Sequence, residues 1–192
     1  MDSLSDNTLM LKVKEGQLDQ LGLLFERHNR PLYGFFYRLT ADGPISEDLV
    51  QNVFVRMIKY RHTYKGDGKF TTWMYHMARN LFADHYKKQK RMGYREDPEA
   101  TDKYLVNEVN AEQVRIQQEQ LDLLQLAMNQ LSPEKKEVLV LSKYQGMRYQ
   151  DIADVLDITE TAVKVRIFRA LKDLKKAYEA LELLPNSRTQ NT

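Results

Sequence analysis

The sequence predicts an all-α fold. Almost every segment repeats its apolar residues at helical spacing, no segment alternates apolar and polar residues as a strand does, and helix start or stop residues separate the segments. Helices are expected over residues 5–14, 18–40, 46–61, 70–91, 110–130, 133–144, 149–156 and 160–183.

The expected helix ends have chemical reasons. Gly16 stands where a helix C-terminus favours a left-handed residue, and Pro31 is a possible break in the second helix. The stretch "GPIS" interrupts the chain up to Ser46, which can cap the third helix. Ser132 before Pro133 places a capping hydroxyl ahead of a proline in the first helical turn, which is a strong start signal.

The charges of the chain fall into three blocks. Residues 1–95 carry 16 Lys and Arg against 10 Asp and Glu, residues 96–125 carry 2 against 8, and residues 126–192 carry 11 against 9. A basic front, an acidic middle and a mildly basic end suggest two modules joined by a segment that repels nucleic acid. The alternative is a set of solvated helix faces with uneven charge.

These blocks and the turn residues predict two helical domains, residues 5–94 and 112–184. The segment between them, residues 95–111, is polar and acidic, and Pro98 interrupts it. We therefore expect a flexible acidic linker there.

Composition excludes several classes of protein. The 192 residues suffice for one domain or two small ones, and the absence of cysteine excludes disulfides and thiolate zinc sites. No apolar run approaches the roughly 20 residues that span a bilayer, and the first residues, "MDSLSDNTLM", are unlike a signal peptide. A cytoplasmic protein without a transmembrane segment is expected.

No catalytic or cofactor site is expected either. His28, His62, His76 and His85 show no metal-ligand spacing, and the chain has neither a phosphate-binding glycine loop nor an activated nucleophile. We therefore expect no enzyme activity, no metal or cofactor and no small-molecule substrate.

The helix expected over residues 70–91 carries both aromatic rings and cations. On a helical wheel Phe70 and the apolar residues that follow it at helical spacing form the core side. Tyr75, Arg79 and Tyr86 lie on the opposite side, where rings beside cations suit base stacking and phosphate neutralisation on a single strand. The alternative is that Tyr75 and Tyr86 pack beneath neighbouring helices.

A glycine-bearing loop, "RHTYKGDGKF", leads into this helix and contains Tyr64. Asn80 lies at the edge of the helix, with Trp73 beside it on the wheel. A loop next to such an edge can wall a pocket for a flipped base, although the pattern alone is a weak signal.

The segment "YQDIADVLDITETAVKVRIFRALKDL" has the spacing of a helix-turn-helix unit, with Ala153 where close helix packing demands a small side chain. Thr159 can cap the second helix. The outward face of that helix carries Val165 and Phe168, which suit contact with thymine methyl groups, and Arg169, which can address guanine or phosphate. A helical hairpin of another function is the alternative.

The helix over residues 47–60 is apolar over about 200° of its wheel, wider than the stripe that one core face requires. It is therefore either sandwiched between two helices or carries a face for a partner protein.

Three motifs in this order resemble a bacterial sigma factor of the extracytoplasmic-function group. "EDLVQNVFVRMIKY" (47–60) resembles the helix of that family that binds core polymerase, and "FTTWMYHMARN" (70–80) resembles its promoter-melting helix. Residues 131–170 resemble its promoter-distal helix-turn-helix domain. The resemblance extends from about residue 8 to residue 180.

The resemblance implies a protein that directs core RNA polymerase to promoters and helps to melt them. Its implied partners are the clamp helices of the largest polymerase subunit and the flap region, promoter DNA, and an anti-sigma factor. The DNA would be bound as duplex at the −35 element and as the single non-template strand at the −10 element.

The resemblance also implies three sets of contact residues. The −10 set is Tyr60, Tyr64, Trp73, Tyr75, His76, Arg79, Asn80 and Lys87. The −35 set is Arg148, Thr161, Lys164, Val165, Arg166, Phe168, Arg169 and Lys172. The polymerase set is Asp48, Gln51, Asn52, Phe54 and Arg56.

The chain departs from the family pattern at a few positions. Arg148 stands where the family often has a Ser or Thr helix cap, and Asp157 replaces a frequent turn glycine. Ala162 and Val165 replace the common Thr and Ser of the recognition helix, which leaves the −35 sequence open.

Two other functions are left as alternatives. A stand-alone helix-turn-helix repressor or activator would read duplex DNA without polymerase, but it leaves the first half of the chain unexplained. An all-α hydrolase using Asp, Glu and His would need a convergent acidic set that the sequence does not show.

Overall fold

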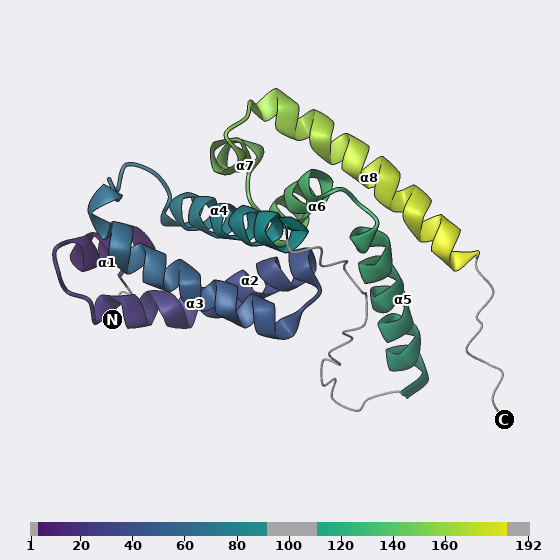
Figure 1. Cartoon of the computed structure of the whole chain (residues 1–192), viewed down its shortest axis with the longest axis horizontal. Coiled ribbons are helices and arrows are strands. Elements are labelled where there is room, and N and C mark those ends of the chain that lie inside the picture. The colour runs from purple at the N-terminus through teal and green to yellow at the C-terminus, as the bar shows by residue number, and fades with distance from the viewer. Residues whose placement is uncertain (1–3, 92–110, 184–192) are drawn as a thin grey trace.

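The computed structural model describes residues 4–91 and 111–183, and every regular element within these two parts is a helix (Figure 1). The all-α prediction is confirmed. The elements are α1 (Asp6–Lys14), α2 (Gln20–Thr40), α3 (Gly43–Tyr60), the short 3₁₀ helix η1 (Arg61–Thr63), α4 (Phe70–Arg91), α5 (Ala111–Asn129), α6 (Pro133–Leu139), the π-helical turn η2 (Val140–Tyr144), α7 (Tyr149–Leu156) and α8 (Glu160–Glu182).

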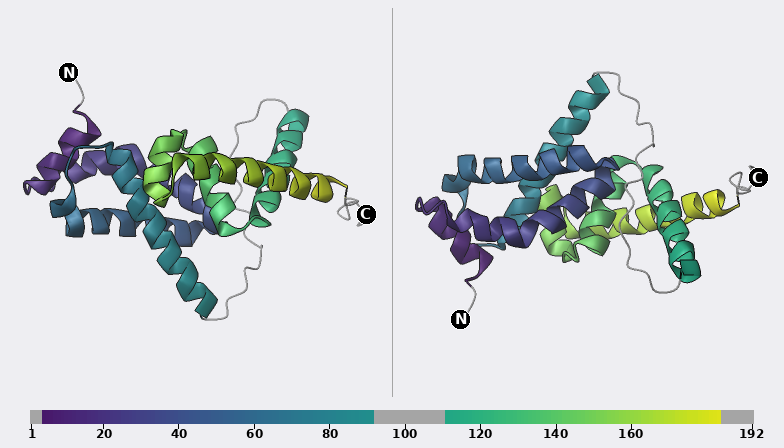
Figure 2. Two further views of the ribbon diagram at one scale, coloured as in Figure 1. Left: turned by 90° about the horizontal axis from the view of Figure 1, so that it is seen from above. Right: turned by 90° about the horizontal axis from the view of Figure 1, so that it is seen from below.

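The first half of the chain is a bundle in which α2 packs against α1 and α3, and α3 packs against α4. Its core is built from fully buried large side chains, among them Phe35, Phe36, Phe70, Met57 and Met74. Burial of such side chains supplies about 1.5–3 kcal/mol each, which is what holds four amphipathic helices together. The last turns of α4 extend clear of this bundle (Figure 2).

The second half is built around α8, which packs against α5, α6 and α7. Ile152, Val163 and Ala170 are buried between these helices, and the small Ala153 is also buried where α7 meets its neighbours. The turn from α7 to α8 ends in Thr159, whose side chain accepts a hydrogen bond from the backbone N–H of Ala162, so the expected helix cap is confirmed.

The two halves lie against each other rather than apart. Helix α7 packs on α4, and η2 and α6 contact α2 (Figure 1). The buried apolar side chains consequently form one continuous cluster across both halves. Most of the expected linker, residues 95–111, lies outside the described residues, so the domain boundaries stay a prediction.

Some expected helix ends are wrong. Helix α3 begins at Gly43, three residues early, because Pro44 fits the first turn, where its missing N–H needs no partner. Its cap is Asp42, whose Oδ1 accepts from Ile45 N at 2.8 Å, whereas Ser46 is buried inside the helix. Helix α2 continues through Pro31. The left-handed conformation expected at Gly16 is confirmed, with φ of 103°.

Residues 133–144 were expected to form one α-helix, but the α-helix ends at Leu139 and continues as the π-helical turn η2. The wider turn carries Val140 and Leu141, both fully buried, into the core. Gly146 follows with φ of 62°, and its left-handed conformation turns the chain toward α7.

Candidate nucleic-acid interface

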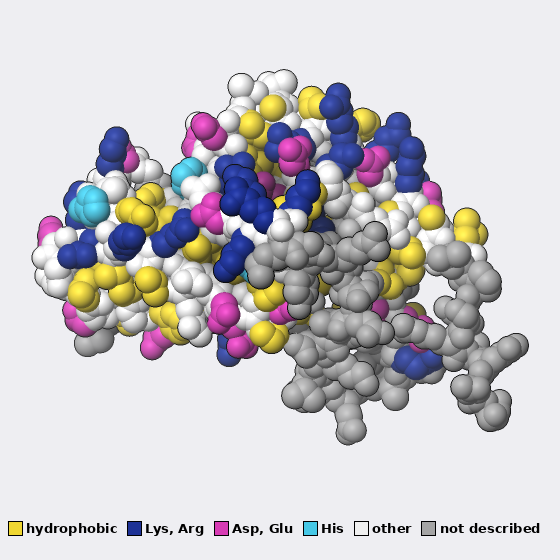
Figure 3. All heavy atoms as spheres, viewed as in Figure 1, with side chains coloured by type: hydrophobic (Ala, Val, Ile, Leu, Met, Phe, Trp, Pro, Cys, Tyr) yellow, Lys and Arg dark blue, Asp and Glu magenta, His cyan; other side chains and the backbone are white. Residues whose placement is uncertain are grey.

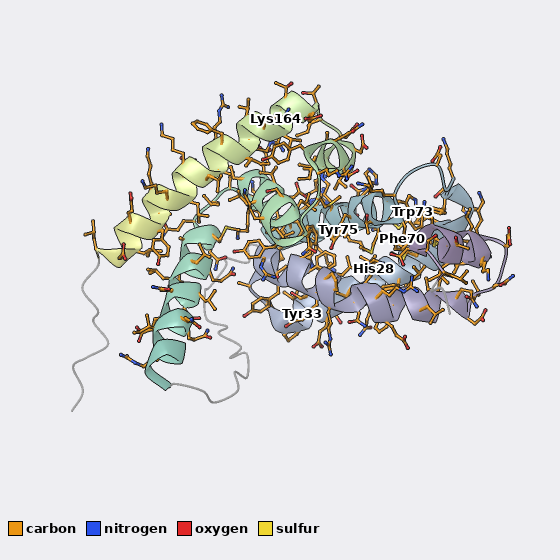
Figure 4. All side chains as sticks on the ribbon, turned by 180° about the vertical axis from the view of Figure 1, so that it is seen from behind. His28, Tyr33, Phe70, Trp73, Tyr75 and Lys164 are labelled. Atoms are coloured by element: carbon orange, nitrogen blue, oxygen red, sulfur yellow. The ribbon has the colours of Figure 1, made fainter. Side chains whose placement is uncertain are left out.

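The loop between η1 and α4 is fixed to α4 by aromatic packing. The ring of Tyr64 lies edge-on to Trp73, with ring centroids 5.0 Å apart, and also lies edge-on to Phe70. Trp73 and Phe70 lie near each other in the first turn of α4 (Figure 4). Tyr64 is buried, and this burial, with the charges of Asp67 and Asp6, raises the pKa of its hydroxyl. Tyr64 therefore supports the loop from beneath. Its ring does not lie at the surface, which differs from the contact role that the resemblance implied.

The outer face of α4, from the loop to the last turns of the helix, is polar and accessible. His76 and Lys87 are exposed, and Asn80 is half-buried with its Nδ2 atom 3.4 Å from Nδ1 of His76. Trp73 is half-buried beside the loop, and Tyr60 is exposed at the end of α3, directly before η1. Hydrogen-bonding groups beside rings and cations are the combination that single-strand binding uses.

Tyr75 is a correction to the sequence-based wheel, which placed it on the outward face. Its side chain is only 4% exposed and packs edge-on against Phe35, with ring centroids 5.3 Å apart. Its hydroxyl donates to Oε1 of Gln145 at 2.6 Å, and burial raises the pKa of that hydroxyl. The alternative that Tyr75 packs beneath a neighbouring element is the correct one, and the half-buried Tyr86 packs near Phe82.

Two acidic side chains of the second half pair with cations of the first. Lys69, directly before α4, forms a salt bridge with Asp151 of α7. Arg79 of α4 lies with Nε 3.5 Å from Oε1 of Glu137 of α6. This pairing reduces the positive charge that α4 presents. Lys and Arg side chains still gather over α4, with acidic side chains among them (Figure 3).

Glu137 is buried, and this burial raises the pKa of its carboxyl to about 7. The charges of Arg79 and Arg166 act in the opposite direction and offset only part of the rise. Glu137 is thus placed between one residue of the −10 set and one residue of the −35 set.

Further contacts close the junction between the halves. The guanidinium of Arg38 lies 4.0 Å from the centroid of the Tyr144 ring, and Nε2 of Gln145 donates to the carbonyl of Pro31 at 3.3 Å. An open cavity of about 350 Å³ remains between the halves, with Tyr75 and Arg148 in its lining.

The outward face of α8 is the second candidate surface. Phe168 is 71% exposed and Val165 is 44% exposed, in a face that also carries cations (Figure 3). Thr161, Arg169 and Lys172 are exposed as expected. The other members of the −35 set are the exposed Lys164, which pairs with Glu160 at 2.7 Å, the exposed Arg148, and the half-buried Arg166.

Apolar side chains exposed in this way on a helix-turn-helix unit suit contact with DNA base edges. Leu171, also on α8, is 40% exposed. Asp157 adopts the left-handed conformation, with φ of 56°, at the turn where a glycine is more common.

The polymerase set divides into exposed and buried members. Asp48, Gln51 and Asn52 are exposed on α3, and Nδ2 of Asn52 donates to the carbonyl of Asp48 at 2.8 Å. Arg56 is half-buried and pairs with Asp84 of α4 at 3.1 Å. Phe54 is buried against Phe25, a correction to its expected role as a contact residue.

The α3 face also carries apolar side chains at its surface, with Val55 60% exposed and Ile58 37% exposed. Helix α3 therefore combines both readings of its wide apolar arc, since part of the arc packs inside the bundle and part remains open to a partner.

Sequence reasoning missed Glu137 and Asp151. Each acts on a cation that lies more than 50 residues away in the chain, and nothing in the local pattern of α6 or α7 marks it as the partner. Within the described residues no cluster of three His, Asp or Glu is placed to hold a metal ion. Across the same residues, no helix combines the length and apolarity that crossing a membrane requires.

Comparison with known families gives two matches. Residues 24–92 match the model of Sigma-70 region 2, and residues 121–174 match the model of Sigma-70, region 4. The first match covers most of α2 to α4, and the second covers the helix-turn-helix unit.

Curated relatives match over most of their length. The ECF RNA polymerase sigma factor SigX of Bacillus subtilis is 28% identical over 166 residues, which are 83% of this chain and 84% of that protein. The RNA polymerase sigma factor CarQ of Myxococcus xanthus is 28% identical over 174 residues, which are 91% of this chain and 98% of that protein.

Two solved structures share the fold. CnrH, solved in complex with the cytosolic domain of CnrY, superposes with a TM-score of 0.69 at 22% identity, over 91% of this chain and 97% of CnrH. RpoE of Bartonella quintana, solved with the anti-sigma factor NepR, superposes with a TM-score of 0.68 at 19% identity, over 83% and 96% of the two chains.

The two matched regions, in this order on an all-helical fold, define a two-region protein of the sigma-70 type. One of the relatives above, SigX, carries the narrower name of an ECF RNA polymerase sigma factor. The chain therefore belongs to the sigma-70 family of RNA polymerase sigma factors, and the relatives that it resembles over most of its length include ECF sigma factors.

Proposed function

We propose that the protein is a dissociable initiation subunit that binds core RNA polymerase, directs it to promoters through their −10 and −35 elements, and promotes DNA melting. It acts by binding, without an enzymatic step, in the cytoplasm and on the nucleoid. The observation that carries the proposal is the presence in one chain of a polar, loop-flanked α4 and of an α8 that exposes Val165 and Phe168 among cations.

At the −10 element, the accessible face of α4 would receive the single non-template strand. Asn80 and His76 would hydrogen-bond a flipped base at the loop edge, and Lys87 would neutralise phosphate. Trp73 and Tyr60 offer rings near that edge, while Tyr64 and Tyr75 support the site from within the core. Arg79 becomes available when its contact with Glu137 is released.

At the −35 element, α8 would enter the major groove of duplex DNA. Val165 and Phe168 would contact apolar base edges, and Arg169 would contact guanine or phosphate. Thr161, Lys164, Arg166 and Lys172 flank them, and Arg148 lies at the start of α7 beside the same groove.

Binding to core polymerase is proposed for the exposed face of α3, and a pull-down tests it. Wild-type protein should form a stoichiometric complex with purified core polymerase. Combining Asp48→Arg with Gln51→Ala should weaken that complex at least tenfold, because the two changes remove contacts at the centre of the face. Asp19→Arg, also a charge reversal at an exposed site of the first half, is the matched control and should bind normally.

The outcomes separate the possible functions. A wild-type protein that binds duplex DNA but not core polymerase would be a stand-alone regulator, and the proposal would be wrong. Wild-type affinity in the Asp48 and Gln51 double variant, with unchanged helical circular dichroism, would place the polymerase contact elsewhere.

An anti-sigma partner is also proposed. The two structural neighbours described above were solved in complex with another protein, which in one case is named as an anti-sigma factor. Co-expression with a candidate inhibitor should yield a complex that competes with core polymerase, and simultaneous binding of both would contradict this part of the proposal.

A further inference from the structure

Helix α1 contacts the whole length of the loop that precedes α4. Asn7 uses both ends of its side-chain amide there. Its Nδ2 donates to the carbonyl of Gly68 at 2.6 Å, and its Oδ1 accepts from the backbone N–H of Phe70 at 2.9 Å. One side chain thus joins the end of the loop to the first residue of α4, whose N–H has no partner within its own helix.

The other end of the loop is held by the same helix. Nζ of Lys14 donates to the carbonyl of Tyr64 at 2.6 Å. Between these two contacts Leu11 lies beneath Gly66, since a Cβ added to Gly66 would be 3.1 Å from Cδ2 of Leu11. Asn7, Leu11 and Lys14 have the i, i+4, i+7 spacing of a single helix face, so one face of α1 follows the loop.

Other contacts of α1 fix it to the bundle. Asp6 accepts from Nη1 of Arg27 at 2.6 Å and lies 2.7 Å from Nε2 of His28. Leu9, Met10 and Val13 are completely buried. The ring of His28 is 5.2 Å from that of Phe70, the residue that Asn7 caps (Figure 4). A helix held this firmly can act as a rigid support.

We propose that α1 sets the shape of the base-binding loop, with Asn7 and Lys14 as positioning residues for recognition of an unpaired −10 base. The proposal rests on the function proposed above. Residues 64–69 include Gly66 and Gly68, and a loop with two glycines samples many conformations unless neighbouring elements restrict it. Restricting it before the base arrives removes part of the ordering cost of binding.

The test uses the full chain assembled with core polymerase and a single-stranded oligonucleotide that carries the −10 sequence of a promoter the holoenzyme transcribes. Lys14→Ala should weaken oligonucleotide binding about tenfold, because residues of the loop lose their fixed conformation. Lys12→Ala is the matched control, since it removes the same charge from the same helix without a contact to the loop. It should leave affinity within twofold of wild type.

Asn7 is tested by a pair of variants that separate positioning from stability. Asn7→Ala loses both hydrogen bonds. Asn7→Asp keeps an acceptor for the N–H of Phe70 but cannot donate to the carbonyl of Gly68. We expect Asn7→Asp to recover the thermal stability that Asn7→Ala loses and still bind the oligonucleotide about tenfold more weakly than wild type. Binding of −35 duplex and of core polymerase should be unchanged in both.

The possible failures are distinguishable. A wild-type holoenzyme that ignores the single strand would overturn the proposed function itself. Wild-type binding by Lys14→Ala and Asn7→Ala, in a holoenzyme that does bind the strand, would overturn the role of α1 alone. Recovery of both stability and binding in Asn7→Asp would reduce Asn7 to a helix cap.

Discussion

Glu137 is a buried carboxyl whose ionisation affects the stability of the folded state. Burial raises the pKa of its carboxyl to about 7 from the ordinary 4.5. The folded protein therefore holds this proton more tightly than the unfolded chain does. Its contribution to the free energy of unfolding is full below pH 4.5 and is lost as the pH rises through 7.

Glu137→Gln keeps the neutral form at every pH and so isolates this effect. The variant should match wild type at about pH 4.5, and its relative stability should grow by up to about 3 kcal/mol by pH 8. Urea unfolding of both proteins across this range measures the difference. A stability difference that does not change with pH would show that the carboxyl titrates normally.

Ala41 and Asp157 are non-glycine residues held in the left-handed conformation at helix ends, with φ of 55° and 56°. This conformation is costly for a residue with a Cβ, and less so for aspartate than for alanine. Ala41→Gly should therefore raise the free energy of unfolding by about 0.5–1 kcal/mol, and Asp157→Gly by less. Denaturant unfolding tests the order, and a loss of stability in both variants would contradict it.

Single residues also show where sequence reasoning succeeds. The exposure of Val165 and Phe168 was predicted from the helical wheel of α8. One face of this helix packs on its neighbours, and the opposite face is therefore exposed. Burial of Tyr75 was only one of two alternatives, and burial of Phe54 was not predicted, because each packs against a ring on another helix, Phe35 and Phe25 respectively. A wheel shows which faces differ, but it does not show which second element covers them.

Among the elements, α8 allows the sharpest test of DNA reading. Arg169→Ala should cost on the order of 1–3 kcal/mol in −35 binding and relax the base preference at one position, as loss of a bidentate base contact does. Lys172→Ala should weaken binding to all sequences alike and reduce the salt slope by about 1, as loss of a phosphate contact does. Binding measurements on a set of −35 duplexes at several salt concentrations separate the two. Uniform loss for Arg169→Ala would make Arg169 a backbone contact.

The elements themselves were largely predictable, because capping residues and apolar spacing act locally. Thr159 caps α8 and Pro133 opens α6 as the sequence indicated, but the hydroxyl expected to cap α6, that of Ser132, makes no capping hydrogen bond. The start of α3 and the π-helical turn η2 were missed. In the first case a proline at a helix start resembles a break, and in the second the turn widens where Val140 and Leu141 are drawn into the core. The contact of α1 with the loop could not be predicted from local sequence either. Asn7 bonds to Gly68 and Phe70, which lie 61 and 63 positions further along the chain.

At the scale of the whole molecule, the second half covers part of α4. Asp151 of α7 pairs with Lys69, which directly precedes α4, and Glu137 of α6 pairs with Arg79, a member of the −10 set. We therefore expect α7 and α6 to separate from α4 when the −10 strand binds. The sequence indicated two regions but not their contact, which depends on pairs more than 50 residues apart.

Asp151→Asn tests this separation from the side that does not bind the strand. Release of one partly exposed ion pair should raise the affinity of the free protein for a single-stranded −10 oligonucleotide about two- to fivefold. Asp154→Asn, on the same helix and exposed, controls for the general effect of removing negative charge. Fluorescence anisotropy measures both, and equal gains in the two variants would contradict a covering role for α7.

If this chain gives promoter specificity to RNA polymerase, that specificity should be visible in the positions at which transcription starts. The most direct test is transcription of fragmented bacterial genomic DNA by purified core polymerase, with and without the protein, followed by sequencing of the RNA 5′ ends. We expect a new set of start sites that share one −35 and one −10 sequence at a fixed spacing, and we expect these sites to disappear with Asn80→Ala. Start sites identical to those of core polymerase alone, from a protein that is folded and bound to the enzyme, would contradict this expectation.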